Sequence, residues 1–380
     1  VLGYGTVGAG VYSMLSDAPG MEAGPVLVRP GKAVESFMVS DAALIFGDPT
    51  VDAVVETLGG LDPAYSYGMR ALEAGKHFIT ANKAMVAAHG LELAALAREK
   101  GAAFLFSAAC GGGVPFLHNL ALSAETDRIE AVSGILNGTT NYMLDAMQRR
   151  GLSYGDALRE AQSLGYAESD PTADVSGLDA LRKMQLACAV AFGVLPQSGM
   201  LCEGMEHFTA ADVEDIQSRG LVCRLMARGS RAGESVSAYV EPVLFPRAAP
   251  ESSVFTNNNM ASYTGKRCGS IVLMGQGAGR FPTASAVLRD LAAAQQGARS
   301  MFPENCRAAE ADNREAVHSY YIRTGGFAAV RLSLRSVLAQ GEVVRAVTEP
   351  MSAEKMHALA QNIRKDGNDL FFAALEEELC

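Results

Sequence analysis

The chain has 380 residues, of which 49% are hydrophobic and 19% are charged, and it carries a net charge of −10 at pH 7. At roughly 100–200 residues per domain, this length predicts two or three folded domains, and the composition excludes a disordered chain. The acidic balance argues against nucleic acid as a partner, because such binding needs a clustered Lys/Arg surface. No run reaches the ~18 consecutive apolar residues of a membrane span, so we expect a cytoplasmic protein without a membrane partner.

The chain carries seven cysteines, none of which forms a CxxC pair. Their odd number disfavours a zinc ribbon or a disulfide framework, and we expect reduced thiols. The first residue is Val1 rather than methionine, and an apolar run leads directly into Gly3. This start indicates a fragment that lacks the first residues of its first strand.

The first part of the chain alternates apolar stretches with helical patterns. Val1 and Leu2 end the first apolar stretch. The later apolar stretches span residues 25–28, 42–46, 51–58, 77–80 and 104–108. The helical patterns span residues 9–15, 63–74 and 91–100. Strands that alternate with helices in this way predict a parallel, doubly wound sheet.

The pattern changes after Pro115. Strands are predicted at residues 129–136 and 269–273, with strand-like alternation between 221 and 243. Helices are predicted at residues 141–149, 154–164, 177–192 and 284–294. The polar segment Glu310–Asn313 indicates a linker, and residues 318–380 then predict a small α/β module.

The segment Gly3-Tyr4-Gly5-Thr6-Val7-Gly8 is a GxGxxG motif between a predicted strand and a predicted helix. The first glycine allows a tight turn, the second lets a pyrophosphate approach the backbone, and the third lets the helix pack close to the strand. The phosphates then lie at the N-terminus of the helix. In this context we interpret the motif as dinucleotide-binding rather than as a merely structural turn.

The second predicted strand leads into Arg29-Pro30-Gly31-Lys32. A site that prefers NAD usually has an acidic residue here, which holds the ribose hydroxyls. No acid is present, and Arg29 is placed to bind a 2′-phosphate; its alternative role is that of a solvated loop arginine. We therefore favour NADP without excluding NAD.

Two further segments carry charged residues in places that are typical of active sites. Thr80-Ala81-Asn82-Lys83 follows a predicted strand directly, and ligands of such a sheet bind beyond the carboxyl ends of its strands. Asp179 and Lys183 are four residues apart, on one predicted helical face. Carboxylates can hold an ammonium group and a lysine can transfer a proton, although most such pairs are surface salt bridges.

Together these motifs resemble the homoserine dehydrogenase family. The resemblance runs in order over most of the chain, through residues 3–8, 54–60, 80–84, 134–142, 165–171, 174–183 and 277–287. The middle segments, such as Leu136-Asn137-Gly138-Thr139-Thr140-Asn141, are the most specific.

The resemblance implies an NAD(P)-dependent oxidoreductase that interconverts L-aspartate 4-semialdehyde and L-homoserine, on the route to threonine, methionine and isoleucine. It implies an α/β fold with a Rossmann nucleotide-binding domain over residues 1–114 and a return segment at about 277–297. A central α/β catalytic and dimerisation domain over 115–276 and an ACT-like module over 310–380 would follow. A homodimer or homotetramer is also implied.

The resemblance also assigns site residues. Lys183 matches the general acid/base lysine, and Lys83 matches a second active-site lysine near the nicotinamide and the substrate. Glu168 and Asp179 match substrate-binding carboxylates. The implied cofactor-binding residues are Gly3, Gly5, Thr6, Val7, Gly8, Arg29, Lys83 and Gly279.

These residue types suit the implied chemistry. Lysine ammonium groups can stabilise the negative charge that grows on the aldehyde oxygen, and can deliver a proton to it. In the reverse direction a neutral lysine must accept the hydroxyl proton, which needs a lowered pKa or high pH. We expect the neighbouring cation Lys83 to help lower the pKa of Lys183.

The loop around residues 106–115 resembles a monovalent-cation site of the family. Its ligands would be the backbone carbonyls of Cys110, Gly112 and Val114, which do not depend on side chains. Ser107 stands where the family usually carries a glutamate. Loss of that carboxylate is expected to weaken the binding of Na⁺.

The C-terminal module resembles an ACT domain in its position and in the segment His318-Ser319-Tyr320-Tyr321-Ile322-Arg323. Thr324-Gly325-Gly326-Phe327 stands where an ACT domain carries an Asp-x-x-Gly ligand turn. We therefore interpret the module as degenerate and do not expect feedback by threonine.

Two alternative functions fit parts of the sequence. One is an aldehyde dehydrogenase with Cys110 as the nucleophile, which would form a thiohemiacetal and then an acyl-enzyme. The other is a dinucleotide-binding regulatory protein without catalysis. Oxidation of NADPH on addition of aspartate semialdehyde would distinguish the regulatory protein from the enzyme.

Overall fold

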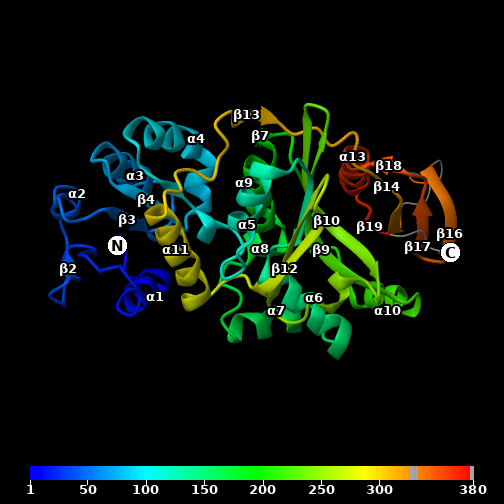
Figure 1. Cartoon of the computed structure of the whole chain (residues 1–380). Helices are drawn as coiled ribbons and strands as arrows, with labels where there is room; N and C mark the ends of the chain where they lie inside the picture. Colours follow the sequence, from blue (N-terminus) through cyan, green and yellow to red (C-terminus); the bar gives the residue numbers. More distant parts are fainter. Residues whose placement is uncertain (326–329, 331–332, 377–380) are drawn as a thin grey trace.

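The N-terminal part of the chain is built on a parallel sheet. The structure, a computed structural model, describes residues 1–325, 330 and 333–376 (Figure 1). The first strands are β1 (Val26–Leu27), β2 (Met38–Val39), β3 (Ala53–Glu56), β4 (His77–Thr80) and β5 (Phe104–Leu105). Leu2 bridges in parallel to Leu27 on one side and to Glu56 on the other. The resulting order, β2-β1-Leu2-β3-β4-β5, is that of a Rossmann sheet and confirms the predicted doubly wound fold.

Helices cover this sheet. The helices of this part are α1 (Thr6–Leu15), α2 (Ala43–Phe46), α3 (Ala64–Glu73) and α4 (Lys83–Lys100). A later helix, α11 (Arg280–Gln295), returns to pack beside α1 (Figure 1). The two helices approach closely at Gly10, where an added Cβ would lie 2.9 Å from Cγ of Arg280. The return segment therefore belongs to the N-terminal part in space.

Two element boundaries differ from the sequence prediction. The stretch 42–46 contains a short helix, α2, rather than a strand. The carboxylate of Asp41 accepts the N–H of Ala43 at 2.8 Å and so favours a helical turn there. Helix α4 begins at Lys83 rather than at Leu91, because the side chain of Asn82 caps it.

The central part of the chain contains long antiparallel strands with helices packed on them. Its strands are β6 (Ile129–Ile135), β7 (Val194–Ser198), β8 (Leu201–Cys202), β9 (Leu221–Ala232), β10 (Ser235–Pro246), β11 (Asn258–Gly265), β12 (Gly269–Gln276) and β13 (Arg307–Glu310). Its helices are α5 (Phe116–Thr126), α6 (Gly138–Arg150), α7 (Tyr154–Ser163), α8 (Thr172–Val175), α9 (Leu178–Phe192) and α10 (Ala210–Ser218). The hairpin of β9 and β10 explains the alternation predicted between residues 221 and 243. Helix α9 packs on β6, β9 and β10 and also contacts α4, so it links the two parts (Figure 1).

The C-terminal strands extend the central sheet. The elements here are β14 (Val317–His318), β15 (Tyr320–Thr324), β16 (Leu334–Gln340), β17 (Val344–Thr348), β18 (Met351–Ser352), α13 (Ala353–Lys365) and β19 (Leu370–Leu375). Strand β19 pairs in parallel with β10, and the sheet runs in the order β12-β11-β6-β9-β10-β19-β15-β17-β16. At the predicted ligand turn, Gly326 and Phe327 lie outside the described residues.

The predicted linker at Glu310–Asn313 is structured instead. Glu310 ends β13, which pairs with β7. Asn313 is buried, donates to the carbonyl of Gly199 at 2.7 Å and accepts the N–H of Ala238 at 3.0 Å. Glu310 is exposed as a linker residue would be, but the hydrogen bonds of Asn313 satisfy its amide inside the protein.

The composition predicted reduced cysteines and no membrane-spanning segment. The cysteines that the structure describes, Cys110, Cys188, Cys202, Cys223, Cys268 and Cys306, are free thiols. No helix in the described ranges is long and apolar enough to cross a membrane.

Candidate active site

The turn Gly3–Gly8 has the close packing that a dinucleotide motif requires. Gly3 has a φ of +96°, a conformation that favours glycine. A Cβ on Gly8 would lie 2.1 Å from the carbonyl oxygen of Gly3, so only glycine lets α1 pack onto the turn. A Cβ on Gly5 would meet no atom within 4 Å, which leaves room for a ligand beside the N-terminus of α1. This geometry fits a pyrophosphate.

A cleft of about 1030 Å³ opens beside the turn. Its lining includes Gly3, Gly5, Arg29, Lys32, Thr57 and Leu58. The structure therefore brings the two predicted cations and the glycine motif into one cleft, which is large enough for a cofactor. The hydroxyl of Thr57 donates to the carbonyl of Leu2 at 3.0 Å and so ties the end of β3 to the turn.

Lys83 stands at the first position of α4. The side chain of Asn82 accepts the N–H of Met85 at 3.1 Å and donates to the carbonyl of Gly60 at 2.6 Å. These bonds fix the start of α4 beyond the carboxyl ends of β3 and β4. From there, Nζ of Lys83 reaches Oδ1 of Asp179 at 3.1 Å.

Asp179 lies in the first turn of α9 and joins two lysines. Its Oδ2 accepts a hydrogen bond from Nζ of Lys183 at 2.6 Å, while its Oδ1 faces Lys83. Lys183 also donates to the carbonyl of Leu136 at 2.6 Å, at the end of β6. The side chains of Asp179 and Lys183 are only 13% and 12% exposed, so this pair is not the solvated salt bridge that the spacing alone allowed.

Asn137 is a site residue that the sequence reasoning did not select. Its Nδ2 donates to Oδ1 of Asp174 at 2.7 Å and to Oδ2 of Asp179 at 2.9 Å. Its Oδ1 accepts the N–H of Thr140 at 2.8 Å and caps α6. Asp174 also accepts a hydrogen bond from Thr139 at 3.2 Å. The N-cap pattern Asn137-Gly138-Thr139-Thr140 was the signal that could have identified this residue.

The charges of the site set its protonation states. Burial alone would raise the pKa of Asp179, but Lys183 and Lys83 outweigh it and hold the pKa of this carboxyl well below its usual range. Burial would likewise lower the pKa of Lys183, yet Asp179 raises it above its usual value. The expected lowering of the pKa of Lys183 is not found, because the Asp179 carboxylate, which lies between the two ammonium groups, raises that pKa instead.

Glu168 is not part of this cluster. It lies on the loop between α7 and α8 and is exposed, and its backbone carbonyl accepts a hydrogen bond from Gln162 at 3.1 Å. The same loop does approach the site at Tyr166, whose carbonyl accepts a hydrogen bond from Thr139 at 2.5 Å. Glu168 therefore lies on a loop that borders the site. Among the described residues, its side chain forms no hydrogen bond or ion pair with either lysine.

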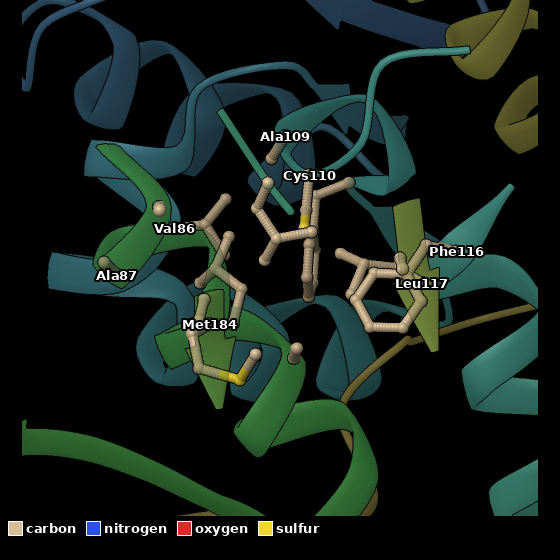
Figure 2. Packing of buried hydrophobic residues seen from close by; sticks show 14 of the residues in the cluster. Val86, Ala87, Ala109, Cys110, Phe116, Leu117 and Met184 are labelled. Carbon is tan, nitrogen blue, oxygen red and sulfur yellow. The ribbon is translucent and has the colours of Figure 1, made fainter. Parts of the chain in front are cut away.

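Cys110 is packed in the apolar core. It is fully buried, and Figure 2 shows it among residues that include Leu117 and Met184. Burial raises the pKa of its thiol to about 12. A nucleophilic cysteine must be a thiolate, so the alternative of a cysteine-dependent aldehyde dehydrogenase does not fit.

The loop that begins at Ser107 is held by a buried carboxylate. Asp290 of α11 accepts the N–H of Ser107 at 2.7 Å and also the Ser107 hydroxyl. A carboxylate therefore lies against this position although the loop itself carries serine. Further along the loop, a Cβ on Gly112 would lie 2.4 Å from the carbonyl oxygen of Gly277. Gly279, with a φ of +113°, follows at the start of α11 and so lies close to this loop.

The fold and the site define a dinucleotide-binding oxidoreductase with paired lysines. The sequence model of "Homoserine dehydrogenase, NAD binding domain" matches residues 3–107, and that of "Homoserine dehydrogenase" matches residues 115–292. The chain is 38% identical to a homoserine dehydrogenase of Corynebacterium glutamicum over 315 residues, which are 77% of this chain and 71% of the relative. It is 34% identical to the enzyme of Bacillus subtilis, over 79% and 73% of the two chains. The chain belongs to the homoserine dehydrogenase family.

Solved structures agree with this assignment. A homoserine dehydrogenase from Thiobacillus denitrificans superposes with a TM-score of 0.87 at 29% identity, over 99% of this chain and 97% of that one. A hyperthermophilic archaeal homoserine dehydrogenase in complex with NADPH superposes with a TM-score of 0.67 at 25% identity, over 80% and 98%. The predicted family, the α/β fold with an NAD-binding domain and the enzyme class are thereby confirmed.

Proposed function

We propose that this enzyme reduces L-aspartate 4-semialdehyde to L-homoserine with NADPH favoured over NADH, and that Lys183 is the general acid. The observation that carries the proposal is the Asp179 carboxylate, which holds the ammonium groups of Lys183 and Lys83 together. Family membership supports the reaction. The cleft that joins the glycine turn to Arg29 and Lys32 supports the cofactor choice.

When bound, the nicotinamide supplies or accepts the hydride. The raised pKa of Lys183 keeps Nζ protonated at neutral pH, so it can stabilise the developing oxyanion and donate a proton to it. Its two acceptors, the carbonyl of Leu136 and the carboxylate of Asp179, fix the position of Nζ. Lys83 provides a second positive charge on the other side of Asp179. In the reverse direction Nζ must first lose a proton, which requires alkaline pH.

The substrate ammonium group needs a carboxylate, and we assign this role to Glu168 and Asp179. Both oxygens of Asp179 already contact lysines, so we infer that Glu168 makes the main contact with the ammonium group and that Asp179 adds its charge to the site while it holds the lysines. Glu168 is exposed and therefore accessible to an ammonium group.

The proposal also includes a monovalent cation on the carbonyls of Cys110, Gly112 and Val114. The fit is incomplete: the Val114 carbonyl accepts the N–H of Phe116 at 2.7 Å, and the Arg289 guanidinium donates to the neighbouring Gly113 carbonyl at 3.1 Å. We route no step through this cation. Activity in buffers that contain Na⁺ or only a bulky organic cation tests it.

We further propose a homodimer formed through the central sheet, with the C-terminal strands as an ACT-like module. Strand β12 is the edge of that sheet, and its exposed apolar side chains Val272 and Met274 are 49% and 61% exposed. An unpaired apolar edge strand favours pairing with another chain. The order β19-β15-β17-β16, with α13 leading into β19, supports the ACT-like assignment. Light scattering of wild type and of Val272→Lys tests the dimer.

Activity of the Lys183→Ala variant tests the proposed mechanism. Oxidation of NADPH is followed by absorbance after aspartate semialdehyde is added. The kcat of the variant should be about 10²–10⁴-fold lower than that of wild type. Titration with NADPH should still give near wild-type affinity, because Lys183 lies outside the cleft that the glycine turn lines. A variant with near wild-type kcat would remove Lys183 from the mechanism.

A further inference from the structure

A second cleft, of about 630 Å³, carries an unusual concentration of arginines. They come from separate elements: Arg98 from α4, Arg128 from the junction of α5 and β6, Arg231 from β9, and Arg299 from the segment after α11. The C-terminal end of α9 forms part of the lining. Phe192 lies at that end, nine residues or about 14 Å along the helix from Lys183. No described residue lines both this cleft and the cofactor cleft, so the two are separate.

The positive charge of this cleft is not neutralised by ion pairs. Among the described residues, none of the four arginines takes part in a salt bridge. The acidic side chains at the cleft are Glu125, Asp127 and Glu304. The carboxylate of Asp127 is engaged with backbone N–H groups, including those of Arg267 and Cys268 at 2.9 Å. In the part of the chain that the structure describes, none of these three carboxylates forms a salt bridge with the four arginines.

The contacts of Arg231 show most directly that this positive charge has no counter-charge within the described ranges. One of its terminal nitrogens donates to the carbonyl of Phe192 at the end of α9, and its guanidinium carbon lies 5.6 Å from the centre of the Phe192 ring. Its Nε is buried and has no hydrogen-bond partner. Burial first, and then the charge of Arg128, lower the pKa of Arg231; Glu234 opposes them, and Arg307 adds a smaller lowering effect.

A buried N–H without an acceptor and a group of like charges both cost free energy. An anion in the cleft would offset the repulsion among the arginines, because its charge balances theirs and its oxygens accept hydrogen bonds from their terminal nitrogens. Guanidinium groups match carboxylate and phosphate oxygens in bidentate geometry. The volume lies in the range of small-molecule sites.

We propose that the cleft lined by Arg98, Arg128, Arg231 and Arg299 binds a small multivalent oxyanion. The ligand would carry phosphate groups or two or more carboxylates. Because Arg98 comes from the N-terminal part and Arg128 and Arg231 from the central part, the bound anion would bridge the two parts of the enzyme. The alternative role for these arginines is to interact with the negative end of the α9 dipole alone.

Calorimetric titration distinguishes the two roles. Inorganic pyrophosphate and citrate are titrated separately into the full chain at constant ionic strength and without nucleotide, because NADP itself carries phosphate groups; Arg29→Ala serves as the reference for binding in the cofactor cleft. Wild type should bind at least one of them saturably at one site per chain, and the tighter of the two identifies phosphate or carboxylate chemistry. Arg231→Gln and Arg128→Gln should each weaken that binding about 10-fold or more.

Arg247→Gln is the matched control, because Arg247 is exposed and lies outside the cleft lining. It should leave the affinity unchanged. Arg128 is exposed as well, so its replacement is not expected to disturb folding. In the absence of anion, Arg128→Gln should keep or raise the melting temperature, since it relieves like-charge repulsion. Absence of saturable binding to wild type, or equal binding by Arg128→Gln and Arg247→Gln, would overturn the proposal.

Discussion

The amide nitrogen of Asn137 donates to two carboxylates at once, at 2.7 Å to Asp174 and at 2.9 Å to Asp179. Two carboxylates this close repel each other, and a shared donor offsets part of that repulsion. Burial raises the pKa of Asp174, and the negative charge of Asp179 adds to this effect. Asn137 therefore keeps Asp179 aligned with Lys183.

Replacement of Asn137 tests this positioning role. Asn137→Ala should lower kcat about 10- to 100-fold, because Lys183 loses its fixed partner geometry. It should also lower the free energy of unfolding by about 1 kcal/mol, because the N-cap of α6 is lost. Asn137→Ser is the matched variant: serine can still cap the helix, so stability should recover while kcat stays low. Recovery of both properties in Asn137→Ser would show that the residue acts only as a cap.

The pH dependence of homoserine oxidation should report the pKa of Lys183. Oxidation needs neutral Lys183, so its rate should rise with pH toward the raised pKa of this residue, whereas the rate of semialdehyde reduction should fall over the same range. Asp179→Asn removes the charge that raises this pKa. The rise of the oxidation rate and the fall of the reduction rate should therefore both occur at lower pH in this variant. Profiles of kcat in both directions measure the shift. Asp312→Asn, which removes a carboxylate paired with the exposed Arg314, is the control and should leave both pH profiles unchanged. Unchanged profiles in Asp179→Asn would contradict the assignment of this pKa to Lys183.

Arg29 should determine the choice between the two cofactors. It lines the cofactor cleft together with Lys32, and no acid lies in the segment Arg29-Pro30-Gly31-Lys32. Arg29→Ala should weaken NADPH binding about 10- to 150-fold, the value of a charge-assisted contact of roughly 1.5–3 kcal/mol. NADH binding serves as the internal control and should hardly change. If both affinities fell together, Arg29 would have a structural role.

Glu168 should act on the substrate rather than on the cofactor. Loss of its charge in Glu168→Gln should raise the KM for homoserine by about 10-fold, the magnitude of a lost charged hydrogen bond, while the KM for NADP stays constant. Steady-state kinetics with each substrate varied in turn provides the measurement. Equal changes in the two constants would indicate that Glu168 supports the loop between α7 and α8 instead.

Asp290 should make the stability of the protein pH-dependent. Burial raises its pKa to about 7, and its hydrogen bonds with Ser107 only partly oppose this. The unfolded value is about 3.9, so the folded state favours the protonated form. Protonated Asp290 therefore adds to the free energy of unfolding. This contribution is complete below about pH 4 and is lost as the pH rises to about 7, at about 1.4 kcal/mol per pH unit.

Asp290→Asn should abolish this pH dependence, because the amide stays neutral and still offers an oxygen to the N–H of Ser107. Urea unfolding of both proteins at several pH values measures it. The free energy of unfolding of Asp290→Asn should rise relative to wild type between pH 4 and 7 and stay level above that range. A difference that does not change with pH would show that Asp290 is ionised in the folded state throughout.

Local patterns determined much of what could be predicted from the sequence. The glycine motif predicted the turn and α1, because the positive φ at Gly3 and the contact of Gly8 with the Gly3 carbonyl both lie within the turn itself. The strand and helix alternation predicted the parallel sheet. The spacing of Asp179 and Lys183 predicted that they share a helical face, and helical geometry alone ensures it. The order of the motifs was sufficient for the family.

Tertiary structure decided every contact between residues of different elements. Packing of α4 on α9 places Lys83 at Asp179, α11 brings Asp290 to Ser107, and β19 joins the edge of β10. The same packing leaves Glu168 outside the lysine cluster and reverses the expected pKa shift of Lys183. Periodicity and propensity describe one element at a time, whereas these distances and charges depend on how the buried faces of several elements fit together.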